Sequence, residues 1–490
     1  MMPRCRAGKD ADPATRDRLC RQQNSATVID RRTLERRPND GLRRLFDDTP
    51  DVNFVGGNYD PLSDVEIRGM GSQTPDVMGN GANRIGMEMD GMTLTPGLNY
   101  GYYTRSGRQY LDPADLKEVE IDKGPGAGWL AGSIRLRSKD PEDYLRENAR
   151  TGGEIRGGYD GENDDISTGA SIAARLDDRN SASLSYNRHW FGERKNRSGA
   201  DIDGPNRHYN NPLDGRSNSP NGKWQYRPND AHRLKLTLQH YDVDNDSRQR
   251  QRIGTASRGA GNILDSRNDR RNVRNAAALR HDIEQPTALF DRMTWQIDAQ
   301  RSSKGRNINL MPSGNFYDHD DYRTRQYTLK TGFEKSLGGA VRHDLDYSLK
   351  LQYGTADFGS ETITPVSRRR GDYFTVAKSR QWQGSAQIAD RISFADNRYA
   401  LPPPAAIRPA PRHPAPARPR LPRPRPARRQ QRRPRSPHRL ATTRSAHPGK
   451  RRHHPPQHQW PLLGKRHRAR AHPEPRAAAT PFPPTHRKTP

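Results

Sequence analysis

Strict alternation of apolar and polar residues is the clearest pattern between residues 151 and 401. It is seen in Leu234–Gln239, Trp295–Gln300 and Tyr347–Tyr353, where every second residue is apolar. Because successive side chains of a strand point to opposite faces, the pattern predicts β-strands with one apolar and one polar face. Such strands form either a half-buried soluble sheet or a barrel wall whose outer face contacts lipid.

The spacing of the strands distinguishes these two architectures. We expect about ten strands, centred near residues 156, 171, 186, 225, 237, 277, 297, 329, 349 and 387. Short connections are expected at 176–180, 227–231, 283–291, 336–344 and 394–398, and long ones at 191–221, 241–270, 302–320 and 355–379. Soluble domains rarely carry several long polar loops, whereas membrane barrels have tight turns at one end and long loops at the other. The spacing therefore favours a membrane barrel.

Two further features bear on this barrel. Aromatic residues near the predicted strand ends suit an interfacial girdle, with ordinary packing as the alternative for each: Trp190, Tyr226, Tyr241, Trp295, Tyr353 and Trp382. Arg398–Leu401 has the pattern of an eleventh strand, which the prolines at 402–404 would end. Since an unpaired strand edge is costly in lipid, we expect that ten strands alone do not make a working pore.

Residues 25–150 mix short strands and helices. Ala26–Ile29 has a strand pattern, and Thr33–Phe46 has a helical one that Pro50 ends. Val65–Arg68 and Ile85–Met89 alternate with period two, and Asp90-Gly91 supplies hairpin turn residues. Further strands are expected at 119–121 and 134–137. The pattern predicts a small α/β domain ahead of the barrel strands.

The stretch 402–490 differs sharply in composition from the rest. Residues 401–490 contribute +22 of the net charge of +28 and hold 23 of the 40 prolines. With few periodic apolar residues they cannot bury a core, so we expect a disordered Arg/Pro/His-rich tail. Its interpretations are a nucleic-acid arm, a proline-rich spacer or the product of a shifted reading frame, and the abrupt change favours the last. In any case the tail should bind polyanions non-specifically.

The first 24 residues carry no visible signal peptide, because no apolar run follows their charged residues. Cys5 and Cys20 are too few for a disulfide framework or a zinc site. The sequence has no apolar run of about 18 residues, which excludes a transmembrane helix.

Candidate chemistry is sparse. The acidic stretch 242–246 imitates a calcium loop but has Ser247 where such loops need glycine and Ile253 where they need glutamate. Asp318, His319 and Asp320 are weak candidates for a metal site at a loop tip. No nucleophile and base lie at a recognisable spacing, so the sequence does not predict an enzyme.

A series of short motifs resembles a known family. The motifs are Glu66-Ile67-Arg68-Gly69, Asn83-Arg84-Ile85, Met89-Asp90-Gly91, Leu116 to Ile121 and Lys123-Gly124-Pro125. In this order they resemble the plug domain of TonB-dependent outer-membrane receptors, in the branch that takes haem or iron from haemoglobin, transferrin or lactoferrin. The resemblance covers about residues 25–145 and continues loosely to Leu401. It marks Arg68, Gly69, Asn83, Arg84, Asp90, Gly91, Gly124 and Pro125 as plug motif positions.

The resemblance gives the parts of the chain their roles. We expect a mainly β protein with an unassigned segment 1–24, an α/β plug at 25–150, the N-terminal part of an antiparallel transmembrane β-barrel at 151–401, and the disordered tail at 402–490. The resemblance implies a bacterial outer-membrane receptor without a catalytic cofactor, which transports haem or ferric iron. The implied partners are the TonB complex of the inner membrane, a host haem- or iron-carrying protein, and outer-membrane lipid.

Two alternatives remain open: a ferric-siderophore receptor of the same fold, and a soluble β-rich binding protein with a basic nucleic-acid arm. Because about ten strands fall short of the family's barrel, we expect this chain to be a truncated or frame-shifted copy that is not functional as written.

Ligand contacts are expected at the outward apex of the plug. By resemblance this apex lies between Asp90-Gly91 and Asp112-Pro113, and it contains Tyr100, Tyr102, Tyr103, Arg105, Arg108 and Tyr110. Tyrosine can coordinate ferric iron or haem, and together with arginine it suits protein surfaces. Packing of these aromatic residues against the barrel wall is the alternative. Residues 1–150 contain no histidine, so an axial histidine from this part of the chain is excluded.

Overall fold

A computed structural model describes residues 26–36, 41–55, 64–71, 84–95, 108, 110–124, 129, 131–196, 199–257, 261–311, 316–338, 341–364, 367–371, 378–394 and 399–401. The expected segments 1–24 and 402–490 lie outside these residues. The chain divides into two units, Met1–Ala415 and Pro416–Pro490, and all described residues belong to the first.

The N-terminal domain, described between residues 26 and 150 and called the plug after the resemblance noted above, contains two small sheets. The strands of the larger sheet follow the order β1-β7-β8-β5-β6 and comprise Ala26–Ile29, Leu116–Asp122, Gly132–Ser138, Ile85–Met89 and Met92–Thr93. The smaller sheet has β2 (Val52–Val55), β3 (Asp64–Ile67) and β4 (Met70–Gly71). Short 3-10 helices lie at Pro113–Asp115 (η2) and Pro141–Asp143 (η3). The mixed α/β composition agrees with the sequence prediction.

The helix predicted over 33–46 is wrong in its extent. The structure has two short helices, α2 (Arg31–Glu35) and α3 (Leu42–Asp47). Asp30 caps α2 by accepting a hydrogen bond from the backbone N–H of Thr33 at 2.9 Å. Pro38 lies in the sequence between the helices, and proline interrupts helical hydrogen bonding. The apolar periodicity alone therefore predicted one helix where the presence of Pro38 in the sequence favours two.

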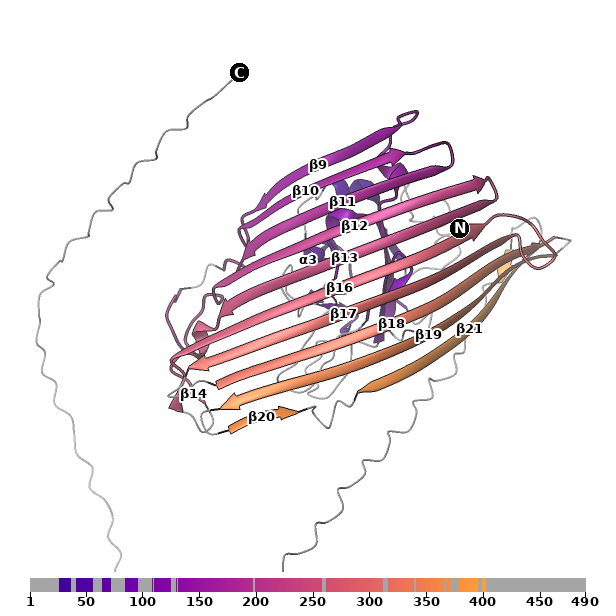
Figure 1. Cartoon of the computed structure of the whole chain (residues 1–490). Helices are drawn as coiled ribbons and strands as arrows, with labels where there is room; N and C mark the ends of the chain where they lie inside the picture. The colour runs from indigo at the N-terminus through magenta and orange to yellow at the C-terminus, as the bar shows by residue number, and fades with distance from the viewer. Residues whose placement is uncertain are drawn as a thin grey trace, which may run out of the picture. The chain divides into compact units, whose positions relative to one another are not determined.

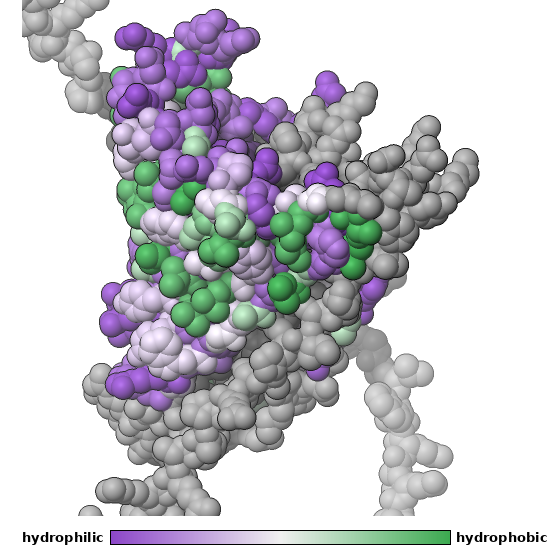
Figure 2. Space-filling model, turned by 90° about the vertical axis from the view of Figure 1, so that its right-hand side faces the viewer, coloured by the Kyte–Doolittle hydropathy of each residue, from purple (hydrophilic) through white to green (hydrophobic). Residues whose placement is uncertain are grey.

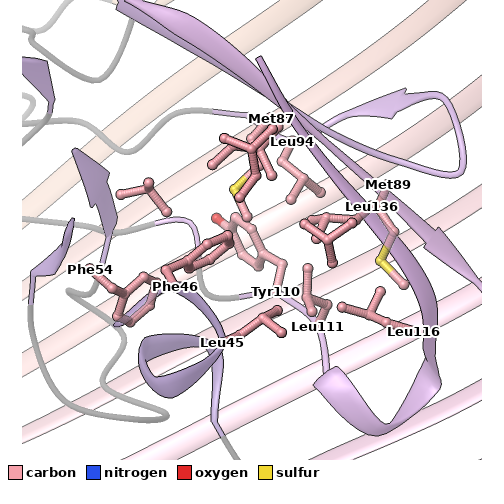
Figure 3. Close-up of a cluster of buried hydrophobic side chains, with 14 of the residues drawn as sticks. Leu45, Phe46, Phe54, Met87, Met89, Leu94, Tyr110, Leu111, Leu116 and Leu136 are labelled. Atoms are coloured by element: carbon pink, nitrogen blue, oxygen red, sulfur yellow. The ribbon is translucent and has the colours of Figure 1, made fainter. Parts of the chain in front are cut away.

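The core of the plug is apolar and continuous. Phe46 of α3 stacks against Phe54 of β2, with ring centroids 6.1 Å apart. Figure 3 shows them beside Met87, Tyr110 and Leu136, which come from different parts of the plug. Val65, Ile67, Ile85, Val119 and Ile134 are completely buried. This core holds the loops of the plug in place, because burial of each such side chain stabilises by roughly 1.5–3 kcal/mol.

Ten long antiparallel strands follow the plug and form what we call the wall sheet. They are β9 (Thr151–Asp160), β10 (Asp165–Arg175), β11 (Asn180–Gly192), β12 (Leu213–Asn229), β13 (His232–Arg248), β16 (Asp265–Ile283), β17 (Arg292–Met311), β18 (Phe316–Leu337), β19 (Val341–Thr364) and β21 (Ser379–Phe394). Each predicted strand centre lies in one of them. Figure 1 shows them side by side in chain order.

Two short strands complete the wall sheet. Strand β20 (Ser367–Gly371) pairs with β19, and β22 (Tyr399–Leu401) pairs with β21. The pattern at 398–401 is thus confirmed as the start of a strand. In the part of the chain that the structure describes, β9 and β22 are the two edges of the sheet and do not pair with each other. The small pair β14 (Ala256–Ser257) and β15 (Gly261–Asn262) lies in the β13–β16 connection.

The connections alternate in the predicted sense up to β16 but not between β16 and β18, because the connection 312–315 is shorter than the connection 284–291. The stretch 302–320 is mostly strand, since β17 ends at Met311 and β18 begins at Phe316. Likewise β19 continues to Thr364. A tilted strand needs only about 9–11 residues to cross a bilayer, whereas β19 has 24. The strands are therefore longer than the apolar part of the sheet. In the parts that extend beyond it, apolar and polar residues no longer alternate, so the sequence pattern does not indicate a strand there.

The burial of the wall sheet is the reverse of that in a water-soluble sheet. In β11, Ser185, Asn187 and His189 are at most 7% exposed, whereas Leu184 is 56% exposed and Tyr186 is 41% exposed. Hydrophobic side chains gather in the middle of the face shown in Figure 2, with mostly hydrophilic ones above them. A lipid solvent accounts for the exposed apolar face. Among the described residues, no helix is long and apolar enough to cross a membrane.

Candidate functional site

The plug contacts the polar face of the wall sheet through acidic side chains, which we call the plug carboxylates. Each of them receives a hydrogen bond or an ion pair from a wall strand. They are Glu88, Asp90, Asp112, Asp115, Asp140 and Glu142. The wall contributes lysine, histidine, amide and hydroxyl groups. At these positions the contact between the two domains is polar, while Phe191, Tyr241 and Val243 of the wall also pack against the apolar core of the plug.

Asp112 caps η2, Asp115 is its last residue, and both meet the first wall strands. Nε2 of His189 on β11 lies 2.9 Å from Oδ2 of Asp112, and its Nδ1 lies 3.0 Å from Oδ2 of Asp165 on β10. An imidazole can donate to both carboxylates only when both its nitrogens carry a proton. Although burial opposes ionisation, the charge and hydrogen bond of His189 lower the pKa of Asp112.

Asp115 has a different environment in the same helix. Its Oδ1 accepts hydrogen bonds from Ser185 Oγ (2.9 Å) and Asn187 Nδ2 (2.7 Å) of β11. Its Oδ2 accepts from Ser219 Oγ (3.0 Å) and Asn221 Nδ2 (2.6 Å) of β12. Burial and the nearby charge of Asp112 raise the pKa of Asp115 to about 7. One 3-10 turn thus holds one ionised carboxyl group and one that titrates near neutral pH.

Asp140 is surrounded by three lysines. Its Oδ1 accepts from Lys223 Nζ of β12 at 3.0 Å and from Lys235 Nζ of β13 at 2.7 Å, while its Oδ2 accepts from Lys117 Nζ of β7 at 2.7 Å. Burial opposes ionisation, but these three ammonium groups hold the pKa of Asp140 well below its usual range. Glu142 extends the contact, since its Oε1 accepts from Ser181 Oγ and Gln225 Nε2.

Glu88 of β5 meets the far strands of the wall. Its Oε1 accepts a hydrogen bond from Lys330 Nζ of β18 at 2.8 Å and lies 3.6 Å from Lys350 Nζ of β19. Burial opposes ionisation, yet the two lysine charges lower the pKa of Glu88 to about 2. The plug carboxylates are therefore distributed from β11 to β19, and the plug spans most of the described wall.

The turn between β5 and β6 is a second contact with the wall. Asp90 and Gly91 have φ of 48° and 78°, as a type I′ hairpin requires. Oδ2 of Asp90 accepts from Gln239 Nε2 of β13 at 2.7 Å. A Cβ atom on Gly91 would lie 2.7 Å from Oε1 of Gln296, so glycine is needed for both backbone and space.

The other motif positions form turns or lie outside the described residues. Arg68 and Gly69 link β3 to β4 with φ of 52° and 72°. The carbonyl of Arg84 accepts from the N–H of Ala131 at 2.9 Å, and the N–H of Gly124 donates to Asp122 Oδ1 at 3.2 Å. Asn83 and Pro125 lie outside the described residues.

The predicted ligand contacts divide into two groups. Tyr100, Tyr102, Tyr103 and Arg105 lie outside the described residues. Arg108 and Tyr110 are inside the plug, 2% and 1% exposed. Arg108 Nη2 lies 2.9 Å from Asp64 Oδ1, and Nη1 donates to the carbonyl of Ile85 at 2.7 Å. Burial raises the pKa of Tyr110. Arg108 and Tyr110 are therefore packed inside the protein.

The structure does not bring the candidate metal ligands together. Asp318, His319 and Asp320 lie in strand β18 instead of at a loop tip, so their side chains alternate between faces. Asp318 and Asp320 form ion pairs with Arg306, and His319 Nδ1 lies 2.5 Å from Asn307 Oδ1. Among the described residues, no group of three or more histidine, cysteine or acidic residues could hold a metal ion.

The sequence did not single out the wall residues that hold the plug. His189, Lys223, Lys235, Lys330 and Lys350 lie on the polar face of alternating strands, which was the one signal available. Asp112 and His189 are 77 residues apart and Glu88 and Lys330 are 242 residues apart. Their pairing depends on the position of the plug against the wall. The alternation of apolar and polar residues does not determine that position.

Comparison with known proteins identifies relatives for both domains. Residues 19–134 match the family described as TonB-dependent Receptor Plug Domain, which consists of transport receptors and not enzymes. The TonB-dependent heme receptor A of Haemophilus ducreyi is 29% identical over 170 residues, which cover 34% of this chain and 21% of that protein. The Hemin receptor of Yersinia pestis is 23% identical over 353 residues, covering 71% of this chain and 45% of that protein.

A solved structure shares the fold. The Serratia marcescens hemophore receptor HasR, solved with its hemophore HasA and heme, superposes with a TM-score of 0.52 at 15% sequence identity. The superposition covers 76% of this chain and 61% of HasR. The chain thus matches 21% of the length of the first of these curated relatives and 45% of the length of the second.

Proposed function

We propose that this chain, a TonB-dependent receptor with a plug domain, serves the uptake of haem across the bacterial outer membrane. One observation carries the proposal: an acidic plug lies against the polar inner face of a sheet whose outer face is apolar. Receptors of this family are outer-membrane proteins, and their dependence on TonB makes the TonB complex the proposed energising partner.

The polar contact suits a plug that has to move. When a plug shifts, water can replace the hydrogen bonds that Asp115 receives from neutral side chains, so each lost bond costs only about 0.5–1.5 kcal/mol net. An apolar contact of the same size would expose hydrophobic surface instead. Most of the apolar core comes from the plug itself, and it extends to Phe191, Tyr241 and Val243 of the wall.

The choice of haem over other iron ligands rests on the relatives. The names of the two curated relatives refer to heme and hemin, and HasR was solved with heme and its hemophore. A haem-carrying host protein is therefore the proposed donor of the ligand. Free ferric iron, or iron carried by transferrin or lactoferrin, is the alternative cargo within this proposal.

Tyr100, Tyr102, Tyr103 and Arg105 remain the proposed contacts on the plug. A tyrosine phenolate can coordinate ferric haem, and an arginine can pair with a haem propionate. Since residues 1–150 contain no histidine, tyrosine is the proposed source of coordination from the plug. Arg108 and Tyr110 are left out of this set because both are buried.

Haem titration of the full chain in detergent micelles tests the proposal. We expect a Soret shift that is lost when Tyr100, Tyr102 and Tyr103 are all changed to phenylalanine. The matched control is Tyr209→Phe, because Tyr209 is 42% exposed and lies in the β11–β12 connection. Equal binding by the triple variant would overturn the tyrosine assignment. Preference for a ferric siderophore over haem would overturn the choice of cargo.

A further inference from the structure

Two histidines meet on neighbouring strands of the wall sheet and have no part in the transport of haem proposed above. His232 is the first residue of β13, and His281 lies two residues before the end of β16. Nδ1 of His232 is 3.0 Å from Nε2 of His281, and the two ring centroids are 5.2 Å apart. Both side chains are half-buried. We call these two residues the histidine pair.

The strand register brings the histidine pair together on one face of the sheet. His232 pairs with Ile283, and His281 pairs with Leu234. The two imidazoles are therefore diagonal neighbours, which are close enough for long side chains to touch. His232 shares its face with Leu238, since alternate residues of a strand point the same way, and Leu238 is 50% exposed. The histidine pair thus lies on the face that points away from the plug.

The histidine pair lies at the rim of this face. It is next to the short connections 230–231 and 284–291. Trp295 of β17 meets the ring of His281 edge-on, at 90° and with ring centroids 5.5 Å apart. Trp295 is one of the predicted girdle residues, and such aromatic residues lie at the border between lipid and water. An ion dissolved in water can therefore reach the imidazoles without crossing the apolar part of the sheet.

The charges beside the histidine pair are engaged with one another on the opposite face. Asp282 accepts hydrogen bonds from Arg233 Nη2 at 3.1 Å and from Arg280 Nε at 2.8 Å. In the described part of the chain, no carboxylate forms an ion pair with either member of the histidine pair. A metal ion binds imidazole in its neutral form, and no carboxylate here holds the pair in its charged form.

The two rings are separated by nearly the distance at which they could share one metal ion. Zn–N bonds in tetrahedral sites are about 2.0–2.1 Å long, which places two imidazole nitrogens about 3.3 Å apart and their ring centroids about 5 Å apart. An imidazole can carry its proton on either nitrogen. Nδ1 of His232 and Nε2 of His281 can therefore both present a lone pair, and a small rotation of the rings replaces their hydrogen bond by an ion.

We propose that the histidine pair binds a divalent transition-metal ion such as Zn²⁺, which clasps β13 to β16. Imidazole is a preferred ligand of zinc, nickel and copper ions. Since no group of three histidine, cysteine or acidic residues among the described residues could hold a metal ion, water completes the coordination.

The clasp joins the two strands where no connection does. The chain links β13 to β16 through residues 249–264, at the other end of both strands. The histidine pair is 49 residues apart in sequence, and a metal clip that closes a long loop restricts the unfolded chain strongly. The ion should therefore stabilise the wall sheet. The proposal does not depend on haem as the cargo.

Zinc-dependent stability of the full chain in detergent micelles tests the proposal. Zn²⁺ should raise the thermal midpoint of the wild type by about 2 °C or more, because an ion that binds only the folded state stabilises it. Mg²⁺ at the same concentration should have no effect, since it prefers oxygen ligands. His232→Asn and His281→Gln each place an amide near the lost ring nitrogen, so each should lose the zinc shift but keep a zinc-free midpoint close to that of the wild type.

The matched control is His343→Asn. His343 lies near the start of β19, at the same end of the sheet, and its Nδ1 contacts Asp390 instead of a second imidazole. This variant should keep the zinc shift. The nine histidines of residues 401–490 are present in every variant and so cannot cause a difference between them. An unchanged wild-type midpoint in zinc, a zinc shift that persists in both His232→Asn and His281→Gln, or its equal loss in His343→Asn would overturn the proposal.

Discussion

At the scale of single residues, the pKa shifts of Asp115 and Asp140 have opposite directions, so the two carboxylates affect the pH dependence of stability differently. Asp140 is ionised because three lysines surround it, whereas the pKa of Asp115 is raised to about 7. A raised pKa means that the folded protein holds the protonated form better than the unfolded chain does. The contribution of Asp115 is therefore complete below about pH 4 and is lost as the pH rises through 7.

The pH response of Asp115 can be measured directly. We expect the thermal midpoint of the wild-type chain in micelles to fall between pH 5 and pH 8. Asp115→Asn keeps a polar group among Ser185, Asn187, Ser219 and Asn221 but does not titrate, so its midpoint should change less over the same range. Identical pH profiles for the two proteins would show that Asp115 does not titrate in this window.

Asp140 should be the more costly carboxylate to remove. Asp140→Asn removes the carboxylate that Lys117, Lys223 and Lys235 share, and breaking a buried ion pair costs about 3–5 kcal/mol. The matched control is Asp164→Asn, because Asp164 forms an exposed pair with Lys195 and such pairs contribute little. Denaturant unfolding in micelles checks both. Equal midpoints for Asp140→Asn and the wild type would contradict the assignment.

At the scale of elements, the β5–β6 hairpin is defined by its turn glycine. Gly91→Ala forces a Cβ into a left-handed conformation and against Gln296. Gly254→Ala has nearly the same φ of 79°, but nothing lies within 4 Å of its Cβ. Backbone strain alone costs about 1–2 kcal/mol. Gly91→Ala should therefore destabilise the protein more than Gly254→Ala does. Equal unfolding midpoints for the two variants would show that the side chain of Gln296 moves aside without loss of stability.

The elements also show how far the sequence predicts the fold. All ten long strands were predicted, because lipid on one side and a polar plug on the other make apolar and polar residues alternate in the middle of the strands. The prediction of a connection at 302–320 was wrong, because both faces of a strand are polar where the strand extends beyond the apolar part of the sheet. The prediction of one helix over 33–46 was wrong, because it was based on the spacing of apolar residues and did not take Pro38 into account. The contacts of the plug carboxylates were not predicted, since partners such as Glu88 and Lys330 are distant in sequence.

At the scale of the whole molecule, the central claim is that the plug carboxylates lie against the inner face of the wall sheet. The most direct test is a crosslink between Asp115→Cys and Asn187→Cys, formed by a short dithiol-reactive reagent in membranes after Cys5 and Cys20 are changed to serine. The control pairs Asp115→Cys with Tyr186→Cys, since Tyr186 precedes Asn187 on β11 but faces outward. The account predicts a crosslink for the first pair only. Equal crosslinking of both pairs, or of neither, would contradict it.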